Sequence, residues 1–198
     1  MRVGVLASGE GTNLQALIDG AGFEVAAVAS DKTAAPALAR ARAAEIATQT
    51  FPRERFLDRP ARDAAVTDWL EEHGIELVVL AGYMALLDAE FVRRWAGRLV
   101  NVHPSLLPAF PGVRAIEQAL AYGGGLFGVT VHLVDEGVDT GPILLQEAVA
   151  LPHARTPEEV HDALRPVEHR LLLTVVRAFA VGGVQPDPAH PRRWIVSA

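Results

Sequence analysis

The chain has 198 residues, half of them hydrophobic, and its 18 Lys and Arg against 24 Asp and Glu give a formal net charge of −6. This apolar content excludes intrinsic disorder as the main description, and the acidic balance argues against bulk nucleic-acid binding. The absence of cysteine excludes disulfides, thiolate nucleophiles and cysteine-ligated zinc. It also fits a reducing compartment.

The N-terminus does not have the pattern of a targeting signal. The apolar run Val3–Ala7 is shorter than the roughly 7–15 apolar residues of a secretory signal. No segment approaches the ~20 uncharged apolar residues of a membrane span. We therefore expect a cytoplasmic protein with neither a membrane nor a nucleic acid as a partner.

The first hundred residues alternate between short apolar runs and segments of helical period. The runs predict five strands, at 3–7, 23–29, 46–50, 75–81 and 99–103. The intervening segments predict helices at 12–19, 34–44, 62–73 and 91–95. This order predicts an α/β fold with a doubly wound, mostly parallel sheet. Such sheets bind ligands at the carboxyl ends of their strands.

The second half has a different pattern, which predicts an antiparallel C-terminal part. A helix is expected at 115–122, followed by two strands at 128–134 and 143–149. A long helix is expected at 157–181, with Pro166 kinking or splitting it. The proline-rich tail 182–191 should lie on the surface. With no internal repeat or linker, residues 1–198 are expected to form one domain.

A glycine-rich segment, Ser8–Leu14, lies between the first strand and the first helix. Its glycines permit close approach of the backbone, and amides at a helix N-terminus favour a phosphate. The segment is neither a Walker loop nor a complete G-x-G-x-x-G fingerprint, because Leu14 occupies the last glycine position. The alternative is a plain turn with Thr12 as its cap.

Asn101 and His103 are two residues apart on a predicted strand and so point to the same side. An amide and an imidazole on one side can hold a developing oxyanion. The alternative is a structural loop in which the asparagine caps a turn and the histidine packs. The dense proline framing of the loop, at Pro104, Pro108 and Pro111, favours a rigid, shaped site.

A third cluster, Asp135–Pro142, places three carboxylates between two predicted strands. One of them could reach His103 and raise the pKa of its imidazole; the alternative is a solvated acidic loop. A metal site made of His103, His132 and Asp139 is disfavoured because the spacing matches no known metal motif. Ser105 lacks the elbow motif of a nucleophile.

Together these motifs resemble those of the folate-dependent glycinamide ribonucleotide formyltransferases. The resemblance rests on SGEGTNLQAL (8–17), LAGYM (80–84), NVHPSLLPAFPG (101–112) and VDTGPILLQ (138–146). It implies a Rossmann-like formyltransferase fold and formyl transfer from 10-formyltetrahydrofolate to glycinamide ribonucleotide in purine biosynthesis. It implies a nucleotide- and phosphate-binding half, 1–100, and a catalytic and folate-binding half, 101–198.

The resemblance also implies the site residues. The catalytic set is Asn101, His103 and Asp139, and no metal is expected. The ribonucleotide set is Gly11, Thr12, Asn13 and Glu168. The folate set is Arg59, Met84, Ala85, Leu86, Leu87, Asn101, Val134, Asp135 and Glu136. Ala85 stands where the family often has arginine, and residues 113–116 lack the histidines that often follow Pro-Gly.

Three other functions are weighed against this one. Methionyl-tRNA formyltransferase should carry a further C-terminal domain, for which this chain has no room. Formyltetrahydrofolate hydrolase normally has an extra N-terminal domain, whereas here the first strand begins directly. A non-catalytic nucleotide-binding module would use the glycine-rich segment but leave Asn101, His103 and Asp139 without a role. The sequence leaves a homodimer open.

Overall fold

The computed structural model describes residues 1–197 of the chain. It divides into two compact units, unit 1 at 1–101 and unit 2 from residue 102 onward. The assignment of different functions to the halves 1–100 and 101–198 stays a prediction. The expectation of one domain stays a prediction.

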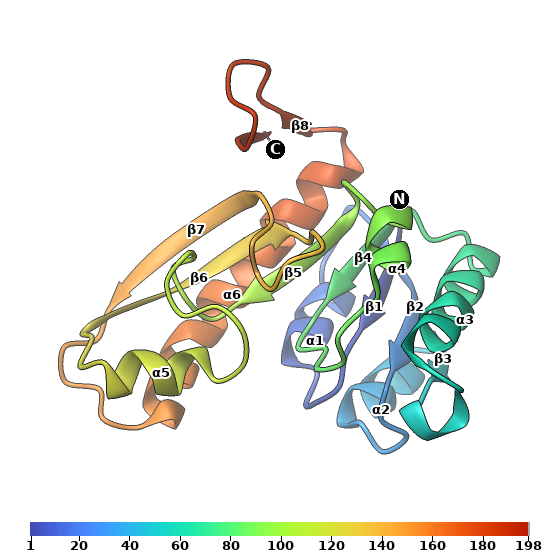
Figure 1. Ribbon diagram of the computed structural model, residues 1–198, viewed down its shortest axis with the longest axis horizontal. Helices are drawn as coiled ribbons and strands as arrows, with labels where there is room; N and C mark the ends of the chain where they lie inside the picture. Colours follow the sequence, from blue (N-terminus) through green and yellow to red (C-terminus); the bar gives the residue numbers. More distant parts are fainter. Residues whose placement is uncertain (198) are drawn as a thin grey trace. The chain divides into compact units, whose positions relative to one another are not determined.

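Unit 1 is built on parallel strands with helices on both faces (Figure 1). Its strands are β1 (Arg2–Leu6), β2 (Glu24–Ser30), β3 (Ala47–Thr50), β4 (Leu77–Leu80) and β5 (Leu99–His103), the last crossing the unit boundary. Its helices are α1 (Thr12–Ile18), α2 (Pro36–Ala43), α3 (Arg59–Glu72) and α4 (Ala89–Arg94), with a 3₁₀ turn η1 (Arg53–Arg55). Helix α1 packs with α2, and α3 packs with α4.

The strands of unit 1 form because their apolar residues are buried on both faces of the sheet. Val3, Val5 and Leu6 of β1 and Val78 and Val79 of β4 are fully buried, as expected for parallel strands covered by helices. Strand β1 lies between β2 and β4. The carboxyl ends of these three strands therefore lie side by side.

Helix α3 begins three residues earlier than the sequence pattern predicted, at Arg59. The Asp58 side chain accepts a hydrogen bond from the Ala61 N–H, and Pro60 lies in the first turn. An acidic N-cap and an early proline both favour this starting point. The first turn of the helix, 59–61, is exposed, so the pattern of buried residues begins only at Arg62.

Unit 2 contains α5 (Ala115–Ala121), β6 (Leu126–Leu133), β7 (Ile143–Ala150), α6 (Pro157–Ala180), β8 (Val184–Pro186) and β9 (Trp194–Val196). Strands β6 and β7 pair antiparallel, as predicted, and α6 packs against both. The hydrogen-bonded order of the main sheet is β3-β2-β1-β4-β5-β6-β7. A mostly parallel α/β sheet with an antiparallel C-terminal part is thereby confirmed.

Helix α6 runs through Pro166 as one 24-residue helix, so the predicted split is wrong (Figure 1). Proline cannot donate to the carbonyl of Asp162. Both residues are exposed, so water can satisfy that carbonyl. The buried residues Leu164, Leu171 and Leu172 lie on both sides of Pro166 in the sequence, and their packing keeps the helix continuous. Among the described residues, no helix is long and apolar enough to cross a membrane.

The tail contains a two-stranded sheet that the sequence pattern did not predict. Strands β8 and β9 pair antiparallel through Val184 and Val196. Each is only three residues long, too short to show a period, and Pro186 in β8 argued against a strand.

Candidate active site

The carboxyl end of β5 carries two polar side chains that differ in their exposure to solvent. Asn101 is partly exposed, whereas His103 is buried, with 5% of its surface exposed. Both lie on the same side of β5, because side chains alternate along a strand. A buried polar group needs partners, and those of His103 show how it is used.

His103 lies between two hydrogen-bond acceptors. Its Nε2 is 2.9 Å from the carbonyl oxygen of Phe110, and its Nδ1 is 3.4 Å from Oδ2 of Asp139. A carbonyl oxygen only accepts, so Nε2 carries a proton in this contact. The Asp139 carboxylate that faces Nδ1 helps to fix the orientation of the ring.

A second imidazole, that of His132 on β6, lies on the other side of Asp139. Its Nε2 is 3.5 Å from Oδ1 of Asp139, and its Nδ1 is 2.8 Å from the carbonyl oxygen of Leu133. Only 1% of His132 is exposed. From its sequence context, His132 was a candidate only for a metal ligand. The available signal was the polar pair Thr130 and His132 inside an otherwise apolar strand.

Asp139 is thus placed between two imidazoles and a backbone donor, the N–H of Gly112 at 2.7 Å. Burial alone would raise the pKa of this carboxyl group. The hydrogen bonds from His132 and Gly112 and the charges of His103 and His132 outweigh burial and lower the pKa to about 2. Asp139 therefore carries a negative charge at any pH at which the protein would work.

The backbone around Asp139 adopts a rare conformation. Asp139 has a φ of 52°, in the left-handed region, which costs energy for a residue with a Cβ. The hydroxyl of Thr140 donates to Asp135 at 2.6 Å. Gly141 is required because a Cβ there would lie 1.8 Å from the Leu133 carbonyl oxygen. The chain pays this cost to hold Asp139 between the imidazoles.

The proline-rich loop after β5 is braced by β6 and β7. The Thr130 hydroxyl donates to the Ser105 carbonyl oxygen at 2.7 Å and accepts from the Leu107 N–H at 3.1 Å. Gln146 donates to the Leu107 carbonyl oxygen at 2.8 Å. The Ser105 hydroxyl donates to the Ala109 carbonyl oxygen at 2.6 Å, so it braces the loop.

In unit 1, the glycine-rich loop Ser8–Asn13 is held by α2. The Ala37 N–H donates to the Gly9 carbonyl oxygen at 3.1 Å, and Arg40 donates to the Glu10 carbonyl oxygen at 2.8 Å. Gly11 is the N-cap of α1, with a φ of 73° and no side-chain cap. The expected alternative, a Thr12 cap, is therefore wrong. As a glycine, the N-cap residue itself offers no side-chain acceptor to the first turn of α1.

The Ser8 side chain joins three strand ends. Its hydroxyl donates to Oδ1 of Asp31 after β2, at 2.5 Å, and accepts from the N–H of Met84 after β4, at 2.8 Å. Asp31 can only accept, so the direction of this chain of hydrogen bonds is fixed. Ser8 is part of the predicted glycine-rich segment, but its sequence context did not predict this role.

The predicted folate segment, Met84–Leu87, lies next to this contact and is fixed by a buried ion pair. Arg62 donates to the Leu86 carbonyl oxygen at 2.8 Å, and Asp63 accepts the Asp88 N–H at 2.7 Å. Burial raises the pKa of Asp63 although Arg62 and the Asp88 N–H lower it. Met84 and Leu86 are each about three-fifths exposed, which suits contact with a ligand ring.

The remaining predicted site residues differ in their exposure to solvent. Arg59 is exposed at the start of α3, and Glu168 of α6 is 5% exposed. Val134 and Asp135 are partly exposed after β6, and Glu136 is exposed. The structure thus brings His103 and Asp139 together. It shows no group of three or more His, Cys, Asp or Glu among its described residues that could hold a metal ion.

Comparisons with known proteins agree with this fold. The formyl transferase family model matches residues 1–176, and the chain belongs to that family. Within it, the similarity is to enzymes of purine synthesis. The chain is 44% identical to phosphoribosylglycinamide formyltransferase of Mycobacterium tuberculosis, over 92% of this chain and 86% of that protein.

Two further relatives extend this similarity. A solved structure of glycinamide ribonucleotide transformylase 1 from Symbiobacterium toebii superposes with a TM-score of 0.95 at 41% identity, covering 100% of this chain and 94% of that one. The human trifunctional purine biosynthetic protein adenosine-3 is 41% identical over 98% of this chain. This chain spans only about a fifth of the length of that protein.

Proposed function

We propose that this chain transfers the formyl group of 10-formyltetrahydrofolate to the amine of glycinamide ribonucleotide. The products are formylglycinamide ribonucleotide and tetrahydrofolate, and the reaction is a one-carbon step of de novo purine biosynthesis. The observation that carries the proposal is the buried pair of His103 and Asp139, found in a formyl transferase 44% identical to a phosphoribosylglycinamide formyltransferase.

His103 and Asn101 act on the formyl oxygen. Attack of the substrate amine on the formyl carbon moves the carbonyl electron pair to oxygen and gives a tetrahedral oxyanion. The Asn101 amide and the charged His103 donate hydrogen bonds to this oxygen. The His103 Nε2 proton is directed at the Phe110 carbonyl oxygen, so the formyl oxygen replaces that acceptor when substrate binds.

Asp139 keeps His103 charged and oriented through the transfer. One proton passes from the attacking nitrogen to N10 of the folate, by way of His103 and a bound water. The bond from the formyl carbon to N10 then breaks, and the carbonyl forms again on the new amide. Proton and electrons balance without a covalent bond to the enzyme.

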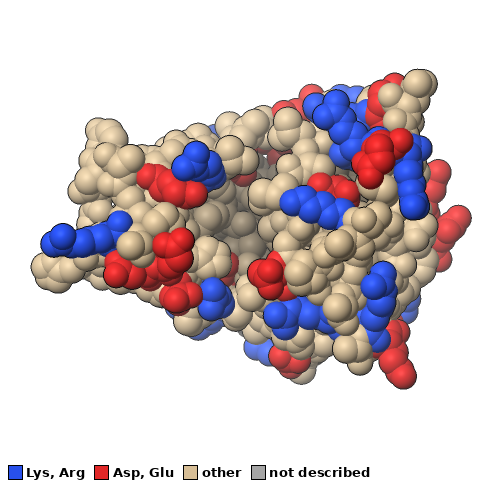
Figure 2. Space-filling model, turned by 90° about the horizontal axis from the view of Figure 1, so that it is seen from below, with Lys and Arg blue, Asp and Glu red and all other residues tan. Residues whose placement is uncertain are grey.

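Both substrates are anions, whereas the chain has a net charge of −6. Acidic and basic side chains are interspersed on the face shown in Figure 2. Binding therefore relies on local groups. We assign the ribonucleotide phosphate to the amides of Gly11–Asn13, the rest of the ribonucleotide to Glu168, and the folate to Met84–Leu87, Arg59 and residues 134–136. A homodimer and a cytoplasmic location stay predictions.

The test is a formyl-transfer assay with the purified chain, with and without glycinamide ribonucleotide. We expect turnover only with the ribonucleotide, and a loss of at least 100-fold in kcat for His103→Ala with the fold retained by circular dichroism. Folate release with water alone would indicate a formyltetrahydrofolate hydrolase. Ribonucleotide binding without turnover would indicate a binding module, and near-normal turnover of His103→Ala would contradict the mechanism.

A further inference from the structure

The tail hairpin, made of β8, β9 and the loop 187–193 between them, lies beyond the residues that the family model matches, 1–176. Its loop is held by its own hydrogen bonds. The Asp187 N–H donates to the Arg193 carbonyl oxygen at 2.8 Å, and the Arg193 N–H donates to the His190 carbonyl oxygen at 3.1 Å. Strand β9 packs against β7 of the same unit. The hairpin is therefore a defined element within unit 2.

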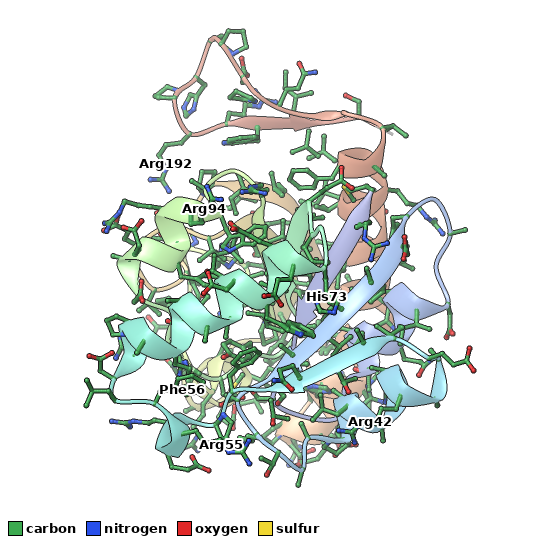
Figure 3. The ribbon with its side chains drawn as sticks, turned by 90° about the vertical axis from the view of Figure 1, so that its right-hand side faces the viewer. Arg42, Arg55, Phe56, His73, Arg94 and Arg192 are labelled. Carbon is green, nitrogen blue, oxygen red and sulfur yellow. The ribbon has the colours of Figure 1, made fainter. Side chains whose placement is uncertain are left out.

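One side chain of this hairpin reaches the loop that carries Asp139. Arg192 donates from Nη2 to the carbonyl oxygen of Thr140 at 2.6 Å, across 52 residues of sequence. In Figure 3 the Arg192 side chain extends away from the hairpin loop. A charged donor makes a stronger hydrogen bond to a carbonyl than a neutral one does. The contacted carbonyl belongs to the peptide between Thr140 and Gly141, one residue beyond Asp139.

The position of the Thr140 carbonyl affects the backbone conformation of Asp139, its neighbour in the chain. The left-handed backbone of Asp139 is strained, and such strain persists only where the surroundings hold it. On the side-chain side, Thr140 is held by Asp135. On the backbone side, the Thr140 carbonyl oxygen accepts the hydrogen bond from Arg192. Val138, just before Asp139, is 54% exposed and contributes little packing.

We propose that Arg192 is a positioning residue for the Asp139 carboxylate. By fixing the Thr140 carbonyl, it holds the left-handed turn that directs Asp139 toward His103 and His132. The tail hairpin thus completes the active site, although Arg192 itself contacts neither substrate. This inference rests on the proposed function for its rate measurement, because Asp139 acts in that reaction through His103.

The chain provides a matched control in the neighbouring residue. Arg193 is exposed, carries the same charge, and its Nε is 3.9 Å from Oδ2 of Asp187, within the hairpin. Arg193→Ala removes one positive charge from the hairpin but leaves the contact with Thr140. Arg192→Lys keeps a charged donor on a flexible stem but loses the planar fork.

The rate experiment measures kcat and both KM values for wild type, Arg192→Ala, Arg192→Lys and Arg193→Ala, with melting temperatures recorded for each. We expect kcat to fall about tenfold in Arg192→Ala, because small displacements of a reacting group are costly. Both KM values should stay within about twofold, Arg192→Lys should recover part of the loss, and Arg193→Ala should match wild type. Equal kcat values for the two alanine variants would overturn the proposal, as would a change in KM alone.

A spectroscopic measurement tests the positioning without turnover. The imidazole ¹⁵N and ¹H signals of His103 and His132 report the position of the carboxylate between them. They should shift in Arg192→Ala and stay in place in Arg193→Ala. Unshifted signals in Arg192→Ala would overturn the inference even if formyl transfer is observed. If wild type transfers no formyl group, the proposed function fails, while the signals still decide whether Arg192 positions Asp139.

Discussion

The glycine-rich loop of unit 1 and the Asp139 cluster of unit 2 are held by different kinds of contact. The loop is held mainly through backbone atoms: Ala37 donates to Gly9, and Gly11 packs where a side chain would not fit. Asp139 is held by charge and by hydrogen bonds to its carboxylate, from two imidazoles and the Gly112 N–H.

This difference determines which substitutions disturb the structure of each region. A loop fixed by close backbone approach is sensitive to volume and insensitive to pH. A buried carboxylate fixed by imidazoles is sensitive to charge, because its ionised form is what the partners stabilise. Substitutions that change volume and substitutions that change charge should therefore have separable effects in the two units.

The largest effect is expected for Asp139→Asn, which keeps the shape of the side chain and removes its charge. His103 loses the carboxylate that favours its charged form, so kcat should fall about 10²–10⁴-fold, the range typical of a lost acid–base partner. The assay is amine-dependent formyl transfer at saturating substrates. Glu158→Gln, which removes an exposed charge from the first turn of α6, should leave kcat unchanged. A loss below about tenfold in Asp139→Asn would contradict the charge-based account of this cluster.

A smaller effect, on binding, is expected for Gly11→Ala. The new Cβ would lie 2.8 Å from Cα and Cβ of Ala37, at a φ of 73° that alanine rarely adopts. The loop must shift, so KM for the ribonucleotide should rise about tenfold while KM for the folate changes little.

Gly9→Ala is the matched control, because a Cβ there meets no atom within 4 Å. It should keep both KM values within about twofold. If Gly9→Ala and Gly11→Ala raise the ribonucleotide KM equally, close packing on Ala37 is not what shapes the loop.

Much of the fold could be predicted because β1, β2, β4 and β5 are short, largely apolar runs that alternate with segments of helical period. The tail hairpin could not be predicted in this way. Its strands have three residues each and contain Pro186. The continuity of α6 depends on which face Pro166 occupies, and that becomes visible only when the buried face of the helix is known.

The site shows a similar division. The rule that chemistry gathers at strand ends predicted only that one carboxylate of 135–142 reaches His103, and the family resemblance named that carboxylate as Asp139. The roles of Ser8 and Arg62 depend on contacts across 76 and 24 residues of sequence, which no local pattern encodes. His132 was visible as a polar residue in an apolar strand, but only the structure shows that it faces the carboxylate of Asp139.

The smallest predicted effect concerns stability and pH, and it separates the two regions. The pKa of Asp139 is about 2 in the folded chain, below its ordinary value of 3.8. The ionised carboxylate therefore stabilises the fold fully above about pH 4, and this contribution is lost as pH falls toward 2. The free energy of unfolding of wild type should exceed that of Asp139→Asn by an amount that shrinks over this interval in urea titrations. The gap between wild type and Gly11→Ala should stay constant over the same interval, because no charge is involved at Gly11. If the difference in the free energy of unfolding between wild type and Asp139→Asn is equally insensitive to pH, hydrogen-bond geometry, and not charge, holds Asp139 in place.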